Sequence, residues 1–193
     1  MNGSKIILAA TAAFATLCAT GATVAASARD KLPYTAVASR VAHDNRMNDM
    51  LASRMLAMHN EERQRLGVPK LKWNRALERE AKAWGRELAR KGRLEHADNR
   101  TRNSTGENLW MGTRGAWNVL VGLEMMIDER ELYRHDNFPK ISRTGQWKDT
   151  AHYSQIVWRD TREVGCSVVN EHGWDVLVCR YWPAGNVWGQ KAY

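Results

Sequence analysis

Two strand-like runs near the end of the chain constrain the fold more than any other feature of the sequence. Residues 164–169 and 174–181 are rich in β-branched and aromatic residues, and the segment EHGW (171–174) connects them. A two-residue turn at His172 and Gly173 would join the runs as an antiparallel hairpin, because glycine readily adopts the backbone conformation of such a turn. The sequence therefore predicts a β-hairpin over these residues.

The predicted hairpin would set Cys166 directly opposite Cys179, since the two cysteines lie at equal distances from the turn. Residues that face each other across paired strands are close enough for a disulfide. We therefore predict a Cys166–Cys179 disulfide, and the alternative is a pair of reduced, buried thiols. Disulfides persist in oxidising compartments, so this pairing would suit an exported protein.

The N-terminus has the character of an export signal. Lys5 precedes an apolar stretch, residues 6–26, without any acidic residue, and Ala26-Ser27-Ala28 fits a signal peptidase site. We predict a cleaved signal peptide over residues 1–28, no transmembrane segment after cleavage, and a secreted or periplasmic location. The remaining chain is long enough for one ordinary domain.

Hydrophobic spacing divides the mature chain into an arm and three helices. Residues 29–46 carry no sustained periodicity and are expected to form a loose N-terminal arm. The first helix is predicted from Met47 until Gly67 and Pro69, the second from its cap Asn74 to Gly92, and the third over residues 116–134.

Three strands are expected after the helices, with long polar loops between the elements. The strands are predicted at residues 153–159, 164–169 and 174–181, and the loops at residues 93–108 and 135–151. Helices followed by an antiparallel sheet indicate an α+β domain, which we place at residues 47–193.

One acidic residue falls on an otherwise apolar helical stripe. Glu129 lies between Met125 and Tyr133 at four-residue spacing in the predicted third helix. A carboxylate that faces a core must be paired, hydrogen-bonded or protonated, because burying an isolated charge is costly. Glu129 therefore has either a functional or a structural role. His96 and Glu107 are further polar residues with apolar or turn-forming neighbours.

Four segments occur in a characteristic order, and they are ENLW (107–110), AHYSQIVW (151–158), VGC (164–166) and VLVCRYWPAGNVWG (176–189). A fifth segment, HNEERQRLGVPKLKWN (59–74), supports the comparison. In this order they strongly resemble the CAP superfamily of SCP-like extracellular proteins. That superfamily includes cysteine-rich secretory proteins, insect venom allergens and plant pathogenesis-related proteins. The resemblance covers roughly residues 51–189 and implies an α-β-α sandwich around an antiparallel sheet.

The resemblance also implies a cleft lined by two histidines and two glutamates, and in members of the family this cleft binds divalent metal. The matching positions here are His96, Glu107, Glu129 and His152. Two neutral imidazoles can ligate Zn²⁺ while carboxylates orient the rings or accept a proton from bound water. We therefore expect His96 and His152 to bind Zn²⁺ or another divalent cation, with Glu107 and Glu129 as cleft carboxylates.

Ligand binding is the leading functional hypothesis. The resemblance points to a sterol or another lipid, held partly beside residues 159–165. Several tryptophans could line such a site, namely Trp110, Trp147, Trp158, Trp182 and Trp188.

Two other functions are alternatives. A hydrolase would use either metal-activated water or Ser154, which in an extended strand shares a face with His152. Binding of an anionic cell-surface or cell-wall polymer would follow from predicted export and a formal net charge of +8. Nucleic acid is not an expected partner, because the basic residues are interspersed with acidic ones.

Overall fold

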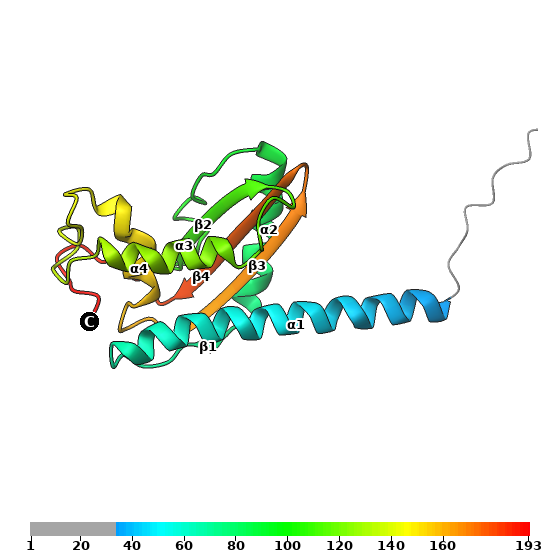
Figure 1. The fold of residues 1–193 in the computed structure, drawn as a ribbon, viewed down its shortest axis with the longest axis horizontal. Helices are drawn as coiled ribbons and strands as arrows, with labels where there is room; N and C mark the ends of the chain where they lie inside the picture. The colour runs from blue at the N-terminus through cyan, green and yellow to red at the C-terminus, as the bar shows by residue number, and fades with distance from the viewer. Residues whose placement is uncertain (1–33) are drawn as a thin grey trace, which may run out of the picture.

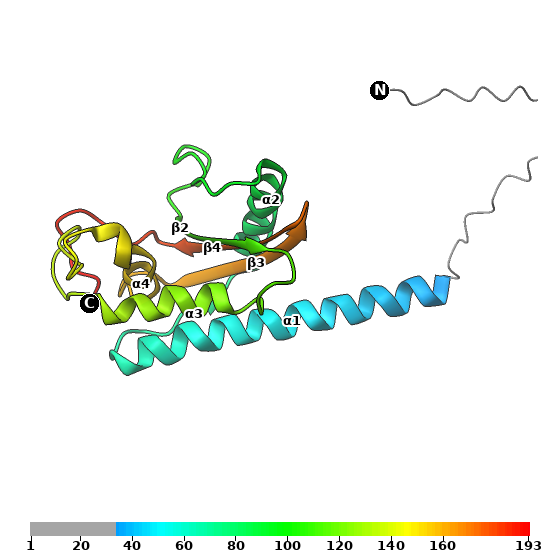
Figure 2. The same cartoon turned by 45° about the horizontal axis from the view of Figure 1, so that its top comes forward.

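Three layers build the fold, with a four-stranded sheet between two sets of helices (Figures 1 and 2). The computed structural model describes residues 34–193, with side chains from residue 42 onward. The elements in chain order are α1 (Tyr34–Arg65), β1 (Lys72–Trp73), α2 (Arg75–Lys91), β2 (Gly106–Thr113), α3 (Val121–Asp128), the 3₁₀ helices η1 (Glu129–Glu131) and η2 (Trp147–Thr150), α4 (Ala151–Ile156), β3 (Glu163–Glu171) and β4 (Trp174–Trp182). The predicted α-β-α sandwich is confirmed.

The β3–β4 hairpin forms the centre of the sheet, whose strand order is β1-β3-β4-β2. Its turn places His172 and Gly173 at positive φ angles of 51° and 82°, as a tight hairpin turn requires. Cys166 pairs with Cys179 across the strands, and the two form a disulfide with a Cα–Cα distance of 4.0 Å. The hairpin and the disulfide are therefore confirmed. The short β1 runs parallel to β3, so the sheet is mixed at this edge.

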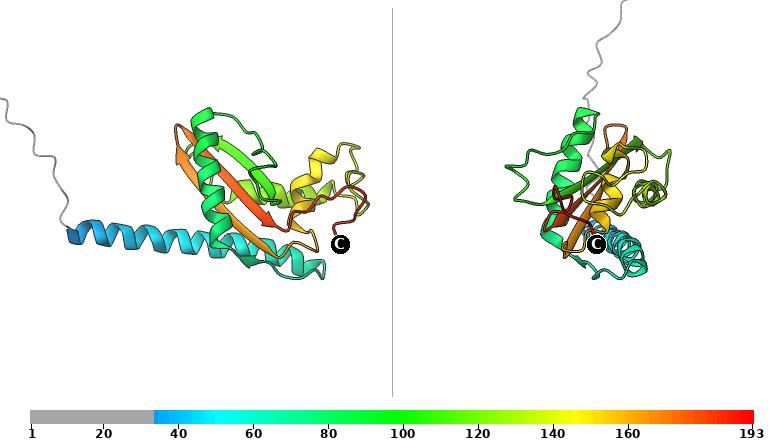
Figure 3. Two further views of the ribbon diagram at one scale, coloured as in Figure 1. Left: turned by 180° about the vertical axis from the view of Figure 1, so that it is seen from behind. Right: turned by 90° about the vertical axis from the view of Figure 1, so that its left-hand side faces the viewer.

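The residues of β4 alternate between the two faces of the sheet, as the period of a strand dictates. Leu177, Cys179 and Tyr181 belong to the core shared with α1, α3 and α4. Val176 and Val178 pack instead against α2 on the other face. Figure 3 shows α2 crossing that face of the sheet.

Helix α2 begins and ends at the predicted caps. The Asn74 side chain accepts hydrogen bonds from the N–H groups of Ala76 (2.7 Å) and Leu77 (3.2 Å), and Gly92 closes the helix in a left-handed conformation. A Cβ atom at Gly165 would lie 2.5 Å from the Asn74 carbonyl oxygen. The absence of a side chain there lets the start of α2 rest directly on β3.

Helix α1 is longer than predicted. It begins at Tyr34, so the expectation of a loose arm over residues 29–46 is wrong from residue 34 onward. Figure 1 shows its N-terminal half extending past the sheet, and residues 42–50 are all exposed. Over residues 42–50, the lack of hydrophobic periodicity therefore reflects exposed positions and not the lack of a helix. The predicted signal peptide lies outside the described residues. From residue 34 onward, no helix has both the length and the apolarity that crossing a membrane requires.

The first predicted strand, residues 153–159, is wrong. Residues 151–156 form helix α4, and Tyr153, Ser154, Gln155 and Ile156 are all buried. A short segment that is buried on every side has no helical stripe, so its pattern cannot be distinguished from that of a buried strand.

The third predicted helix, residues 116–134, is shorter than expected. Helix α3 covers Val121–Asp128 and continues into η1, and its buried residues include Leu123 and Met126, whereas Met125 is exposed. The stripe predicted through Met125 is therefore wrong. Strand β2 was not predicted as a strand, and its first residues fall in the predicted loop at residues 93–108.

Candidate functional site

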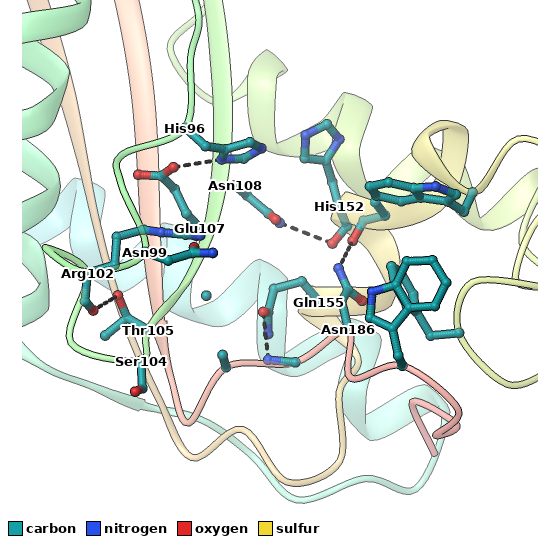
Figure 4. Close-up of a pocket in the computed structure, with 17 residues that line it drawn as sticks. His96, Asn99, Arg102, Ser104, Thr105, Glu107, Asn108, His152, Gln155 and Asn186 are labelled. Carbon is teal, nitrogen blue, oxygen red and sulfur yellow. Dashed lines mark hydrogen bonds and ion pairs between the residues drawn. The ribbon is translucent and has the colours of Figure 1, made fainter.

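A cavity of about 600 Å³ lies beside β2, an edge strand of the sheet (Figure 4). Its walls come from the loop after α2, the first residues of β2, Phe138, the 3₁₀ helix η2, helix α4 and the segment after β4. Most of the lining side chains are polar, and they are His96, Asn99, Arg102, Ser104, Thr105, Glu107, Asn108, His152, Gln155 and Asn186. The structure thus brings three of the four predicted cleft residues, His96, Glu107 and His152, to one cavity. The fourth, Glu129, does not line the cavity but is hydrogen-bonded to His152.

His96 and Glu107 form the first histidine–carboxylate pair. His96 Nδ1 donates a hydrogen bond to Glu107 Oε1 at 2.6 Å, and the N–H of Ala97 donates to the same oxygen at 3.1 Å. Glu107 Oε2 is ion-paired with the buried Arg180 guanidinium at 3.0 Å. Burial lowers the pKa of Arg180, and the Glu107 carboxylate opposes this shift. Both oxygens of the buried Glu107 therefore have partners.

His152 and Glu129 form the second pair, at the start of α4. His152 Nδ1 donates to Glu129 Oε1 at 2.5 Å, and the N–H of Tyr153 donates to Glu129 Oε2 at 3.0 Å. The N–H groups in the first turn of a helix have no partner within the helix. Glu129 therefore accepts hydrogen bonds from the His152 side chain and from the Tyr153 backbone. These two bonds fix the His152 imidazole relative to α4.

Both pairs leave the same atom of the histidine ring without a partner. Because a carboxylate accepts the hydrogen bond from each Nδ1, the neutral form of each ring has its proton on Nδ1 and its lone pair on Nε2. Among the described residues, no hydrogen-bond partner is found for Nε2 of His96 or His152. Their side chains are 59% and 32% exposed, and Figure 4 shows both rings at the same end of the cavity. A carboxylate-supported imidazole with a free Nε2 has the chemistry of a metal ligand.

A series of buried hydrogen bonds connects the His152 backbone to helix α1. Asn108 Nδ2 donates to the His152 carbonyl at 3.0 Å and to the Tyr181 hydroxyl at 3.2 Å. The Tyr181 hydroxyl donates in turn to His59 Nε2 at 2.9 Å, and His59 Nδ1 donates to the Met55 carbonyl at 2.8 Å. Burial lowers the pKa of His59 to about 4, so its ring is neutral near pH 7. Asn108 and His59 lay within the matched segments, but their partners could not be read from the sequence.

Ser154 is not in the cavity. Its side chain is buried and does not line the wall. Residues two apart face opposite sides of a helix, whereas they share one face of a strand. The expectation that Ser154 and His152 share a face is therefore wrong, because it depended on the incorrect strand.

The tryptophans expected near a ligand separate into two groups. Trp147 and Trp188 line the cavity, whereas Trp110, Trp158 and Trp182 do not. Trp158 is almost fully buried in the main core.

A second cluster of potential ligand atoms lies at His59, Cys166 and Cys179, all within 4.8 Å of one another. The two sulfurs are joined in a disulfide, and both nitrogens of His59 are engaged in hydrogen bonds. To bind a cation, this cluster would need free thiolates and a free nitrogen on His59. This cluster is therefore a structural part of the core.

The α-β-α sandwich and its pair of carboxylate-supported histidines define the class of SCP-like, extracellular-type domains. Residues 56–181 match the model of CAP, described as the cysteine-rich secretory protein family. The chain belongs to this family.

Individual relatives agree with this assignment. The chain is 34% identical to pathogenesis-related protein 1B of Nicotiana tabacum over 139 residues, covering 72% of this chain and 78% of that protein. It is 33% identical to the human Golgi-associated plant pathogenesis-related protein 1 over 134 residues, covering 69% and 82%. Among solved structures, NaASP2 with Zn²⁺ matches with a TM-score of 0.59 at 21% identity, covering 73% of this chain and 83% of that one. The structural likeness shows the fold alone.

Proposed function

We propose that this chain is an exported binding protein whose cavity holds one divalent cation. Nε2 of His96 and Nε2 of His152 would be its protein ligands, and water or a ligand oxygen would complete the coordination. The observation that supports this proposal is the state of the two rings, since each Nδ1 is held by a carboxylate and each Nε2 is left for a ligand. When bound, the cation would supply a Lewis-acid site for an oxygen-containing ligand.

The use of the two carboxylates favours binding over catalysis. Glu107 accepts from His96 and Ala97 and pairs with Arg180, while both oxygens of Glu129 accept hydrogen bonds. Both oxygens of Glu129 are occupied, and Glu107 Oε2 is buried and ion-paired with Arg180, so neither carboxylate is placed to take a proton from bound water. The serine version of the hydrolase hypothesis lacks an accessible nucleophile, because Ser154 is buried.

The cavity offers both polar side chains and an aromatic surface, which together suit a ligand with polar groups better than a plain lipid chain. The lipid hypothesis placed a ligand beside residues 159–165, where Trp158 is buried in the core. Arg63 holds this segment to α1 by donating to the carbonyls of Trp158 (2.8 Å) and Thr161 (3.0 Å). Lipid binding is therefore the competing hypothesis, and cholesterol-containing vesicles test it.

Three observations support export. The N-terminal sequence predicts a signal peptide, the Cys166–Cys179 disulfide suits an oxidising compartment, and the family is described as secretory. The cell-wall polymer hypothesis remains consistent with export and with the formal net charge of +8.

Calorimetric titration of Zn²⁺ into metal-free protein at pH 7.5 tests the cation site. We expect one site in the wild type and no binding in the His96→Ala or His152→Ala variant. His43→Ala is the matched control, because His43 is an exposed histidine on α1 outside the cavity. Binding should also disappear in acid, since protonated imidazoles cannot ligate. Unchanged binding in both cavity variants would refute the proposal.

A further inference from the structure

Three aromatic residues form one part of the cavity wall, and we call them the aromatic rim: Phe138, Trp147 and Trp188. Phe138 is buried and lies between the two indoles. Its ring centroid is 5.3 Å from that of Trp147 and 5.6 Å from that of Trp188, with interplanar angles of 64° and 90°. Trp188 is nevertheless 70% exposed. An exposed indole on a cavity wall offers a large apolar surface to a ligand.

Trp188 is held in place by the backbone on either side of it. The N–H of Gly189 donates to the Phe138 carbonyl at 2.8 Å, and the N–H of Phe138 donates to the Gln190 carbonyl at 2.8 Å. The Asn186 side chain donates to the Ala151 carbonyl at 2.9 Å and so ties the same segment to α4. The indole is thus exposed on a fixed backbone, which lowers the entropy that a ligand must overcome on binding.

The two indoles are not equivalent. Lys148 Nζ lies 5.9 Å from the centroid of the Trp147 ring, so a cation occupies part of the space over that indole. No such cation is found over Trp188 among the described residues. Trp188 therefore presents the larger free aromatic surface of the rim.

Three buried polar atoms of cavity-lining residues lack a hydrogen-bond partner among the described residues. They are Asn186 Oδ1, Arg102 Nε and Glu107 Oε2, and the last of these is ion-paired with Arg180. Because these atoms are buried, the polar groups that a ligand meets are the exposed side chains of the wall, such as Asn99 and Ser104. An apolar lipid chain would offer those side chains no hydrogen bond.

We infer that the cavity contains a saccharide subsite at which a sugar ring of a β-1,4-linked oligosaccharide stacks on Trp188. A pyranose ring with equatorial substituents has a flat C–H face that suits an indole. Its hydroxyl groups both donate and accept, which suits the exposed amide of Asn99 and hydroxyl of Ser104 on the cavity wall. The volume of about 600 Å³ lies within the range of cavities that bind small ligands. The inference rests on the proposed function in placing the sugar beside the cation site, but it uses different residues.

Titration with chitotetraose and with cellotetraose, each in the presence of Zn²⁺, tests the saccharide subsite. We expect the wild type to bind at least one of them and the Trp188→Ala variant to bind it at least tenfold more weakly. Trp117→Ala is the matched control, because Trp117 is 57% exposed and lies outside the cavity wall. Bound oligosaccharide should also reduce acrylamide quenching of tryptophan fluorescence in the wild type and in Trp117→Ala, but not in Trp188→Ala.

The Zn²⁺ titration of each variant separates the two proposals. Trp188→Ala should bind Zn²⁺ like the wild type, which also shows that the variant is folded. Absence of binding to either oligosaccharide in Zn²⁺-loaded wild type would overturn the saccharide subsite and leave the cation site standing. Equal oligosaccharide affinity in Trp188→Ala and wild type would also overturn it, as would protection of Trp188 by cholesterol-containing vesicles instead of sugars.

Discussion

Two groups of polar side chains differ in how much hydrogen-bonding capacity they leave unused. His59 and Arg63 of α1, which we call the α1 network, are buried, and every donor and acceptor of their side chains has a partner. His96 and His152 in the cavity each use one nitrogen and leave the other free. Unused capacity, more than polarity or burial, therefore distinguishes a candidate ligand from a structural residue.

Arg63 shows how fully the α1 network is satisfied. Its guanidinium donates to the carbonyls of Pro69, Ile156, Trp158, Arg159 and Thr161. Burial lowers its pKa to about 10, so Arg63 remains charged near pH 7. These bonds fix the chain at the end of α4, the helix that carries His152. The α1 network thus supports the cavity without reaching it.

The largest predicted effect is the loss of Arg63. Replacement by Met would leave five carbonyl groups without their donor, and we expect the free energy of unfolding to fall by about 4 kcal/mol. Urea denaturation measures this change. Arg54→Met, at an exposed position of the same helix, should change stability by less than about 0.5 kcal/mol. Similar small effects for both variants would show that the α1 network contributes little.

The disulfide should have the next largest effect. Cys166 and Cys179 are separated by 13 positions, and closing a loop of this size contributes about 3 kcal/mol in the chain-entropy model. The double Ala variant should lose about this much stability but still bind Zn²⁺, because the disulfide lies in the core and not in the cavity. Free thiols detected by mass spectrometry in the exported protein would contradict the pairing.

The third prediction concerns the pH dependence of stability. The pKa of His59 falls from 6.5 to about 4 on folding, so the unfolded chain binds more protons between these values. Its contribution to stability is therefore complete above pH 6.5 and decreases as the pH falls toward 4. Between pH 7.5 and 5 this amounts to about 2 kcal/mol.

His59→Gln should lose less stability over the same pH range, because a neutral amide does not titrate. Urea denaturation with EDTA removes any contribution of bound metal in both proteins. The other histidines are present in both proteins, so their contributions cancel in the comparison. Identical pH profiles would mean that His59 is not the titrating group.

The smallest predicted effect concerns a carboxylate of the cavity. Glu129→Gln keeps an acceptor for the N–H of Tyr153 but removes the charge that supports His152. We expect it to destabilise the fold less than Glu129→Leu and to weaken Zn²⁺ affinity roughly tenfold. Calorimetry measures the affinity. If the Gln variant binds Zn²⁺ as the wild type does, Glu129 has no part in the cation site.

The elements that could be predicted from the sequence are those fixed by local interactions. The β3–β4 hairpin and helix α2 depend on a turn or a cap a few residues long, and both were predicted close to their observed bounds. Helix α4 was predicted as a strand, because its burial on every side comes from tertiary packing. The length of α1 was missed since no hydrophobic face marks its N-terminal half.

The candidate site could be predicted only in part. His96, Glu107, Glu129 and His152 were identified by the family resemblance, but local spacing could not show which histidine pairs with which glutamate. The four lie on separate segments, and only the folded chain pairs His96 with Glu107 and His152 with Glu129. Glu129 was noticed for an incorrect reason, because it lies in η1 and not on an apolar stripe of α3.

The difference between used and unused ring nitrogens can be tested directly by anomalous diffraction at the zinc edge from a crystal soaked in Zn²⁺ near pH 7.5. We predict one strong peak in the cavity, about 2.0–2.1 Å from Nε2 of His96 and from Nε2 of His152, with both Nδ1 atoms still bound to their carboxylates. A peak at either Nδ1, a peak beside His59, or no peak in the cavity would contradict this account.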